Sequence, residues 1–138
     1  MDRIDKSRRS WNMGRIKGRD TAPEIAVRSL LHSAGCRFRL HRKDLPGRPD
    51  IVLPGRKAVI FVHGCFWHRH IGCRYCYMPK SNVDFWQAKF AGNVDRDRKN
   101  AEALRKTGWQ VIVVWECELS APGKLQRRLE QLLGTTIR

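Results

Sequence analysis

The apolar positions in the first half of the chain predict one helix followed by three strands. Thr21 is a suitable N-cap and Glu24 completes a capping box, after which apolar residues recur at helical spacing until a glycine stops the helix. Residues 36–41 alternate between apolar and polar, as in a half-buried strand, whereas residues 51–53 and 57–62 are mostly apolar. Short turns separate these runs, so we expect a three-stranded meander behind the helix.

The second half of the chain predicts two helices, a strand and a closing helix. A short helix over residues 81–90 should precede a highly charged one over residues 93–107. Residues 109–115 are nearly all apolar, which is typical of a central strand covered on both faces. Residues 122–133 carry leucines at helical spacing. The order α-βββ-αα-β-α predicts a single α/β domain over residues 21–138.

Residues 1–20 are polar and strongly basic, and we predict an arm that has no core of its own. Trp11 and Met13 are set among cations such as Arg15. An arm of this kind could lie along a phosphate backbone with its few apolar side chains reaching inward, or it could be a frayed terminus. We favour the arm that contacts DNA.

Composition narrows the choice of partner and compartment. The 138 residues contain 28 Lys and Arg against 13 Asp and Glu, a net charge of +15. This excess opposes compaction by self-repulsion, so nucleic acid is a better explanation than solubility, which acidic residues serve better. Five cysteines without a secretory segment or a long apolar span predict a reducing, cytoplasmic setting, which favours thiolate–metal bonding over disulfides.

Cysteine and histidine are crowded directly after the third predicted strand. Cys65, His70 and Cys73 have spacings that suit tetrahedral zinc, and either Cys76 or Cys117 could supply the fourth ligand. Four protein ligands would make the site structural. The alternative is a set of buried thiols without a metal, but this loop has little apolar content that could order it otherwise.

An acid–base group is predicted beside the same loop. Asp50 follows a turn and begins a strand, where its carboxylate could bind Mg²⁺ or simply cap the turn. The third strand returns alongside it and ends near His63. His68 could act as a general base whose imidazole is oriented by Asp97, although only a contact in three dimensions can establish such a pair.

Large aromatic residues interrupt this polar loop. Phe66 and Trp67 lie between the first cysteine and the histidines, and Trp86 follows shortly. In a basic protein, exposed aromatic rings can stack on bases or wedge between them. The alternative is that Phe66 and Trp67 pack against the sheet.

Five separated motifs together resemble the very-short-patch repair (Vsr-type) DNA mismatch endonucleases. The motifs are Leu-Pro-Gly-Arg-Pro-Asp at 45–50, Val-His-Gly-Cys-Phe-Trp-His at 62–68, Phe-Trp at 85–86, Asn-Val-Asp-Arg-Asp-Arg at 93–98, and the segment from 109 to 117. The resemblance runs in order from about Arg8 to Leu119, so it is highly specific. The family has a restriction-endonuclease-like PD-(D/E)xK core, a mixed sheet flanked by helices, with a structural zinc site.

The resemblance implies an Mg²⁺-dependent endonuclease that nicks one strand of duplex DNA beside the T of a T:G mismatch. Such mismatches arise when 5-methylcytosine deaminates. It also implies a monomer that acts at the bacterial nucleoid ahead of other repair proteins. Two rival functions remain open from the sequence: a homing or restriction-type nuclease of the same fold, and a non-catalytic zinc module that binds DNA through charge and stacking.

The resemblance carries over residue by residue. Asp50 is similar to the Mg²⁺-binding aspartate, and Val62 stands where the family lends a main-chain carbonyl to that metal. The positions that match catalytic or substrate-holding residues are His68, its supporting carboxylate Asp97, Glu24 of the first helix, and His63 and Asn93, which match holders of metal-bound water and phosphate. The implied zinc ligands are Cys65, His70, Cys73 and Cys117. Expected DNA contacts are Trp11, Met13, Arg15 and Arg48, with Phe66, Trp67 and Trp86 matching the intercalating aromatics.

Two features depart from the expected pattern. The usual second nuclease carboxylate and its lysine are absent after Asp50, so the catalytic metal must rely on main chain, water and phosphate. The spacing between His70 and Cys73, together with the extra Cys76, complicates the fourth zinc ligand. The family match extends to Cys117, which is therefore the favoured choice.

Overall fold

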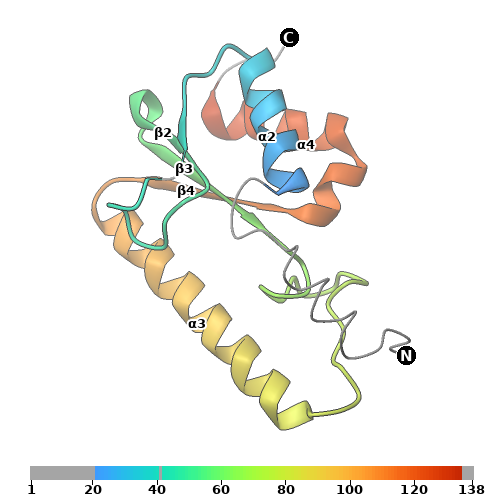
Figure 1. Cartoon of the computed structure of the whole chain (residues 1–138). Coiled ribbons are helices and arrows are strands. Elements are labelled where there is room, and N and C mark those ends of the chain that lie inside the picture. Colours follow the sequence, from blue (N-terminus) through green and yellow to red (C-terminus); the bar gives the residue numbers. More distant parts are fainter. Residues whose placement is uncertain (1–20, 41, 135–138) are drawn as a thin grey trace.

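The computed structural model describes residues 21–40 and 42–134, so the predicted arm, with Trp11, Met13 and Arg15, lies outside the described residues. These residues form a mixed four-stranded sheet with helices on both faces (Figure 1). The strands are β1 (Arg39–Leu40), β2 (Ile51–Leu53), β3 (Ala58–His63) and β4 (Gln110–Trp115), in that spatial order. β1 to β3 form the predicted antiparallel meander, and β4 runs parallel to β3.

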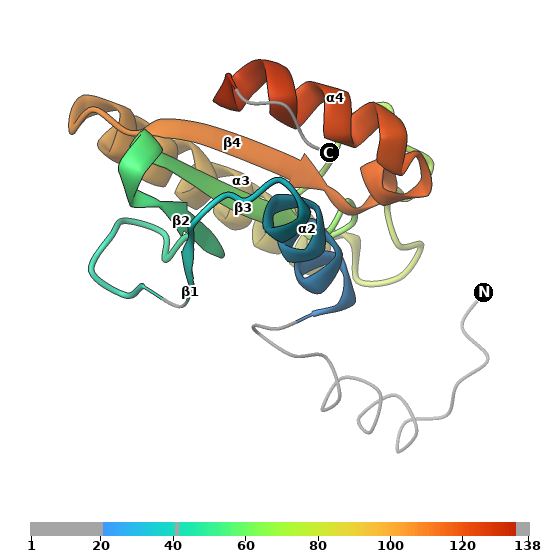
Figure 2. The same ribbon diagram turned by 90° about the horizontal axis from the view of Figure 1, so that it is seen from above.

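The helices cover the two faces of the sheet unequally. α2 (Ala22–Ser33) and α4 (Pro122–Leu133) lie on one face and α3 (Val83–Lys106) on the other (Figures 1 and 2). The hydroxyl of Thr21 accepts a hydrogen bond from the backbone N–H of Glu24 at 3.4 Å, which confirms the predicted N-cap. Two short 3₁₀ segments, η1 (Pro54–Arg56) and η2 (Glu116–Ser120), follow β2 and β4.

The core follows the same division. Alternate residues of the strands point to opposite faces. The larger core, under α2 and α4, contains Val27, Leu31, Ile51, Leu53, Ala58, Ile60, Ile112, Val114, Leu125, Leu129 and Leu133. Under α3 the buried set is Val52, Val59 and Leu104. Each buried side chain of this kind contributes about 1.5–3 kcal/mol, so most of the apolar stabilisation comes from the first face.

Three predictions about these elements were wrong in detail. The two helices expected over 81–107 are one helix, α3, because the glycine at position 92 costs only about 1 kcal/mol and is tolerated in 24 residues. The first strand is shorter than 36–41, since β2 offers only three residues for pairing. β4 lies at the edge of the described sheet and not at its centre.

Among the described helices, none is long and apolar enough to cross a bilayer.

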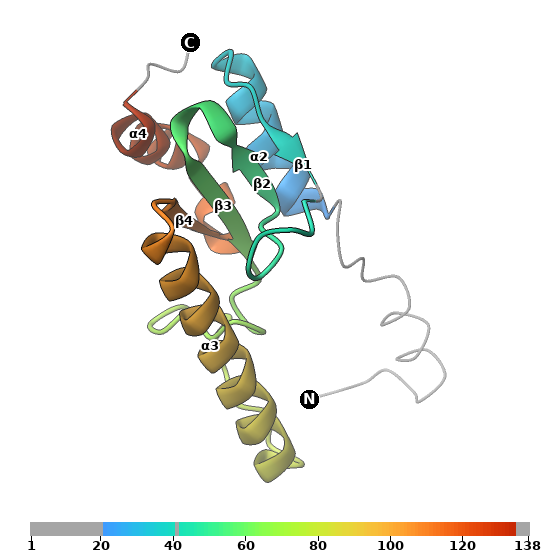
Figure 3. The ribbon, with the colours of Figure 1, turned by 90° about the vertical axis from the view of Figure 1, so that its left-hand side faces the viewer.

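The parallel pairing of β3 with β4 brings two distant segments of the chain to the same end of the sheet. His63 pairs with Trp115 at the carboxyl ends of both strands. Cys65 and Cys117 each follow two residues later, so two distant segments leave the sheet side by side. The first part of α3 runs beyond the sheet alongside the segment that follows β3 (Figure 3). Residues from both halves of the chain therefore meet at this one end of the molecule.

Candidate active site and metal centre

A cleft of about 600 Å³ opens where β3 ends. Its walls come from α2, the loop before β2, the end of β3, the cysteine- and histidine-rich segment, and the middle of α3. The predicted site residues that line it are Glu24, Arg48, Asp50, Val62, His63, Phe66, Trp67, His68 and Asp97. The structure thus brings together side chains that are up to 73 positions apart, counting from 24 to 97.

Asp50 is held at the floor of this cleft. Its Oδ2 atom accepts a hydrogen bond from the backbone N–H of Val62 at 2.7 Å, so the carboxylate takes the place of a strand partner. Since the N–H and C=O of one strand residue face the same side, the Val62 carbonyl lies on the Asp50 side as well. Glu24 is almost fully buried beside it and pairs with Arg28 at 3.3 Å.

Burial raises the pKa of Asp50 to about 7. The Val62 N–H opposes this shift, whereas the neighbouring Glu24 carboxylate adds to it by repulsion and hydrogen bonding. Two carboxyl groups packed this closely favour a shared proton or a cation. Glu24 therefore faces the cleft as well as standing in the first turn of α2.

His68 is paired with Asp97 of α3. Its Nδ1 atom lies 2.6 Å from Asp97 Oδ2, so the contact that the sequence could only suggest is present. Because a carboxylate accepts, Nδ1 carries the proton, and in the neutral form of the ring Nε2 is the nitrogen with the lone pair. The His68 ring stacks on the ring of His63, with centroids 3.9 Å apart and planes 7° apart. Burial lowers the pKa of His63 to about 4, and the adjacent His68 adds to the shift.

His63, His68 and Asp97 also lie close enough to suggest a metal site, with ligand atoms within 4.8 Å of one another. The ring geometry argues against it. An imidazole binds a metal in the plane of its ring at about 2.0–2.1 Å. One ion cannot lie in both planes when the two rings are stacked in parallel. The His68–Asp97 pair is better suited to moving a proton.

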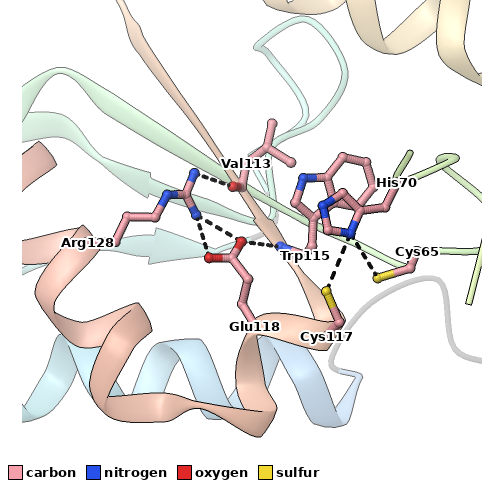
Figure 4. A network of polar contacts seen from close by, with 7 residues as sticks. All are labelled: Cys65, His70, Val113, Trp115, Cys117, Glu118 and Arg128. Carbon is pink, nitrogen blue, oxygen red and sulfur yellow. Dashed lines mark hydrogen bonds and ion pairs between the residues drawn. The ribbon is translucent and has the colours of Figure 1, made fainter. Parts of the chain in front are cut away.

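The second group of ligands is Cys65, His70, Cys73 and Cys117, whose donor atoms all lie within 4.8 Å of one another. His70 Nδ1 lies 3.7 Å from Cys65 Sγ and 3.4 Å from Cys117 Sγ (Figure 4). The structure therefore places Cys117 in the group and leaves Cys76 outside it. Three thiols and one imidazole are a donor set for tetrahedral, thiolate-preferring metals. Burial raises the pKa of the Cys65 thiol to about 12, so a cation is what would ionise it.

Residues around Cys117, to which no role of their own was assigned from the sequence, support the Cys/His group. The ring of Trp115 stacks on His70 with centroids 4.3 Å apart. Glu116 accepts a hydrogen bond from the Cys65 N–H at 3.0 Å. Glu118 accepts from the Trp115 N–H and pairs with Arg128 of α4, which also donates to the Val113 carbonyl (Figure 4). The sequence signal that could have found Trp115, Glu116 and Glu118 is their position within two residues of Cys117, a predicted ligand.

The predicted aromatic residues form one cluster beside the cleft. Phe66 contacts Trp67, Trp86 and Phe90 with ring centroids 5.1–5.7 Å apart. The cluster thus rests on the first turns of α3, and Phe85 next to it is 60% exposed. Aromatic rings are therefore presented at the rim of the same cleft that holds Asp50 and His68.

Two further predicted residues are placed differently. Asn93 donates from Nδ2 to the Trp67 carbonyl at 3.1 Å. Its amide therefore holds the loop that carries Phe66 and Trp67, here called the aromatic loop, and does not line the cleft. Arg48 is exposed at the cleft with a φ of +50°. The glycine before it approaches Asn100 of α3 so closely that a Cβ there would lie 2.9 Å from the amide nitrogen. Asn100 is a positioning contact for the Asp50 loop that the sequence did not reveal.

This fold, a mixed four-stranded sheet flanked by helices, belongs to the restriction-endonuclease-like class. The structure is similar to the homing endonuclease I-Bth0305I catalytic domain, with a TM-score of 0.57 at 19% identity, over 82% of this chain and 94% of that one. The predicted fold is thereby confirmed.

Sequence comparison identifies the family within this class. The family model for DNA mismatch endonuclease Vsr matches residues 1–74. The chain is 46% identical to the DNA mismatch endonuclease Vsr of Escherichia coli K12, over 88% of this chain and 77% of that one. It is 55% identical to the type II nicking enzyme V.XorIIP of Xanthomonas oryzae pv. oryzae, over 96% of each. The chain belongs to the DNA mismatch endonuclease Vsr family and is an endonuclease, as the resemblance implied.

Proposed function

We propose that this endonuclease nicks one strand of duplex DNA beside the T of a T:G mismatch left by deamination of 5-methylcytosine, with Mg²⁺ as its catalytic cofactor. The observation that carries the proposal is the meeting of a partly buried carboxylate, Asp50, with the His68–Asp97 pair in one cleft. We expect the enzyme to act as a monomer on chromosomal DNA in the bacterial cytoplasm.

The residues at the floor of the cleft fit a magnesium ion. Hard oxygen ligands suit Mg²⁺, and the Asp50 carboxylate and the Val62 carbonyl lie on one side of β3. Burial raises the pKa of Asp50, so a cation bound beside this carboxylate would favour its ionised form. When bound, Mg²⁺ would polarise the scissile phosphate and neutralise its developing charge. No second carboxylate–lysine motif of the usual nuclease kind is needed for this role.

His68 is the proposed general base. Asp97 accepts the Nδ1 proton and fixes the tautomer and the orientation of the ring. The free Nε2 can then remove a proton from the water that attacks the phosphorus. The ring of His63 stacks on the face of the His68 ring and limits its rotation. Because the pKa of His63 is lowered to about 4, this contact adds no charge at neutral pH.

The four-residue Cys/His group is the proposed structural zinc site. Cys65, His70, Cys73 and Cys117 would fill all four tetrahedral positions, which leaves none for a substrate. A zinc ion there would tie the segment after β3 to the segment after β4. Its role is to hold His68 and the aromatic cluster in place.

The aromatic cluster is the proposed detector of the mismatch. Phe66 and Trp67 line the cleft and rest on α3, so they can wedge into a base step without losing their support. Unstacking costs least where pairing is already weak, which favours insertion beside a mismatch. Arg48 at the cleft can contact the phosphate backbone.

A nicking assay on a panel of duplexes tests the proposal. The panel has a T:G pair within randomised flanks, and matched T:A and C:G duplexes serve as controls, all with Mg²⁺. We expect strand-specific nicking of some T:G duplexes and no cutting of matched ones. Equal cutting of matched DNA would favour a homing or restriction-type nuclease. Tight binding without any nicking would favour a non-catalytic zinc module.

A further inference from the structure

Arg69 stands between the two histidines with different roles, and its side chain joins three segments. Its Nη1 donates to the carbonyl of Phe66 at 3.2 Å and to the carbonyl of Tyr77 at 2.8 Å. Its guanidinium lies over the buried ring of Phe90 in α3, 4.0 Å from the centroid. One cation therefore connects the aromatic loop, the end of the Cys/His segment and the helix beneath them.

Two successive carbonyls of the aromatic loop are held by side chains. Arg69 holds the carbonyl of Phe66, and Asn93 of α3 holds the carbonyl of Trp67 at 3.1 Å. Each is a backbone acceptor that a flexible loop would otherwise leave to water. Clamping both fixes the backbone from which the Phe66 and Trp67 rings project.

The backbone of Arg69 is itself in an unusual conformation. Its φ is +58°, in the left-handed region that a non-glycine residue occupies only when its surroundings compensate. The three contacts of the guanidinium supply that compensation. The turn also separates His68, which faces Asp97, from His70, which faces the cysteines.

We propose that Arg69 is a positioning residue that sets mismatch selectivity by holding Phe66 and Trp67 as a rigid wedge before DNA arrives. The inference rests on the proposed function of the wedge. A preordered wedge enters the base stack without first losing conformational freedom, whereas a loose one must be ordered during insertion. Arg69 thus acts where stacking must be broken and has little effect where the stack is already open.

The test compares Arg69→Asn with the matched control Arg74→Asn. Asparagine tolerates a positive φ, so the first variant removes the guanidinium with little backbone strain. Arg74 belongs to the same segment and donates to the Tyr75 hydroxyl, so its variant removes the same charge elsewhere in that segment. Each variant is assayed with Mg²⁺ on a T:G duplex, and on the same duplex with an abasic pair at the step on either side of the mismatch. Zinc content is measured on every preparation.

On the intact T:G duplex we expect Arg69→Asn to lower kcat/KM about tenfold relative to Arg74→Asn, with zinc retained. Of the two abasic duplexes, the one that the wild type nicks faster is used for the comparison. On it the two variants should differ by less than about twofold, because no stack remains to be broken. In a Trp67→Ala background, Arg69→Asn should add little, since the wedge is already lost. Arg69→Lys, which keeps the charge, should fall between the wild type and Arg69→Asn.

Equal losses on the intact and abasic duplexes would overturn the inference, because they would show a general structural role. No loss on the intact duplex would overturn it as well. Loss of zinc in Arg69→Asn would do the same, since the defect would then pass through the metal site. If the wild type nicks no T:G duplex, the proposed function itself fails, which is distinct from a failure confined to Arg69.

Discussion

His68 and His70 lie two residues apart, yet they belong to sites of opposite character. Nδ1 of His68 meets a carboxylate at 2.6 Å and its ring lines an open cleft of about 600 Å³. Nδ1 of His70 faces two thiols at 3.4 and 3.7 Å in a group with four protein donors. A closed set of ligands gives a scaffold, whereas an open position allows chemistry. The two histidines thus differ in the partner of Nδ1, and the roles that we propose for them follow from that difference.

The two sites also differ in what supports them. The Cys/His group is attached to the ends of both β3 and β4 and is backed by the stacked ring of Trp115. The cleft depends on side chains of α3, whose face of the sheet buries few residues. The Cys/His group is therefore anchored at the ends of two paired strands, whereas the cleft draws part of its wall from α3.

The largest expected effect concerns the cleft and comes from Asp50→Asn. The amide keeps the shape and can still accept the Val62 N–H, but it removes the negative charge that would bind Mg²⁺. We expect nicking of a T:G duplex to fall by at least about 10³-fold while binding to the duplex remains within a few-fold. Single-turnover nicking and a binding titration check this. Retained nicking would remove Asp50 from the mechanism.

The next effect concerns the scaffold site and comes from Cys117→Ala, with Cys76→Ala as its matched control. Loss of a ligand from a structural metal site should lower the free energy of unfolding by about 3–5 kcal/mol. Cys76 lies outside the four-donor group, so its variant should keep both zinc and stability. Urea unfolding and zinc analysis check both variants. The assignment is reversed if Cys76→Ala is the variant that loses zinc.

A smaller effect is the pH dependence of stability in the metal-free cleft. The pKa of Asp50 is raised to about 7 in the native protein and is about 4 in an unfolded chain. Between these values the native state keeps a proton that the unfolded chain has released, so this contribution to stability falls as pH rises through the window.

Asp50→Asn has no carboxyl group to ionise, so its stability does not fall over this pH window. In EDTA-treated protein with zinc retained, it should melt about 5 °C above the wild type near pH 8, and the difference should vanish near pH 4. Thermal unfolding of the two proteins across that range checks the sign. A difference that grows towards low pH would contradict the raised pKa.

The elements were predictable from the sequence to different degrees. The cap at Thr21 and the three-stranded meander follow from local chemistry, and the structure confirms both. The continuity of α3 through Gly92 and the edge position of β4 depend on packing between distant segments. Local propensity could not reveal either.

The site shows the same limit. Residue type and spacing left Cys76 and Cys117 open, and the family resemblance favoured Cys117. The pairing of His63 with Trp115 in parallel strands is what places Cys117 beside the other three candidate ligands. The His68–Asp97 contact spans 29 positions and became visible only with α3 in place. The clamp by Arg69 gave no sequence signal, since a single arginine in a basic chain is unremarkable.

The most direct measurement compares His68→Ala with His70→Ala for zinc content and for single-turnover nicking of a T:G duplex. We expect His68→Ala to keep a stoichiometric zinc and the wild-type fold while its nicking falls by about 10²–10⁴-fold. We expect His70→Ala to lose zinc and to unfold more easily. Loss of zinc from His68→Ala, or a stoichiometric zinc in His70→Ala, would contradict the division of roles between the two histidines.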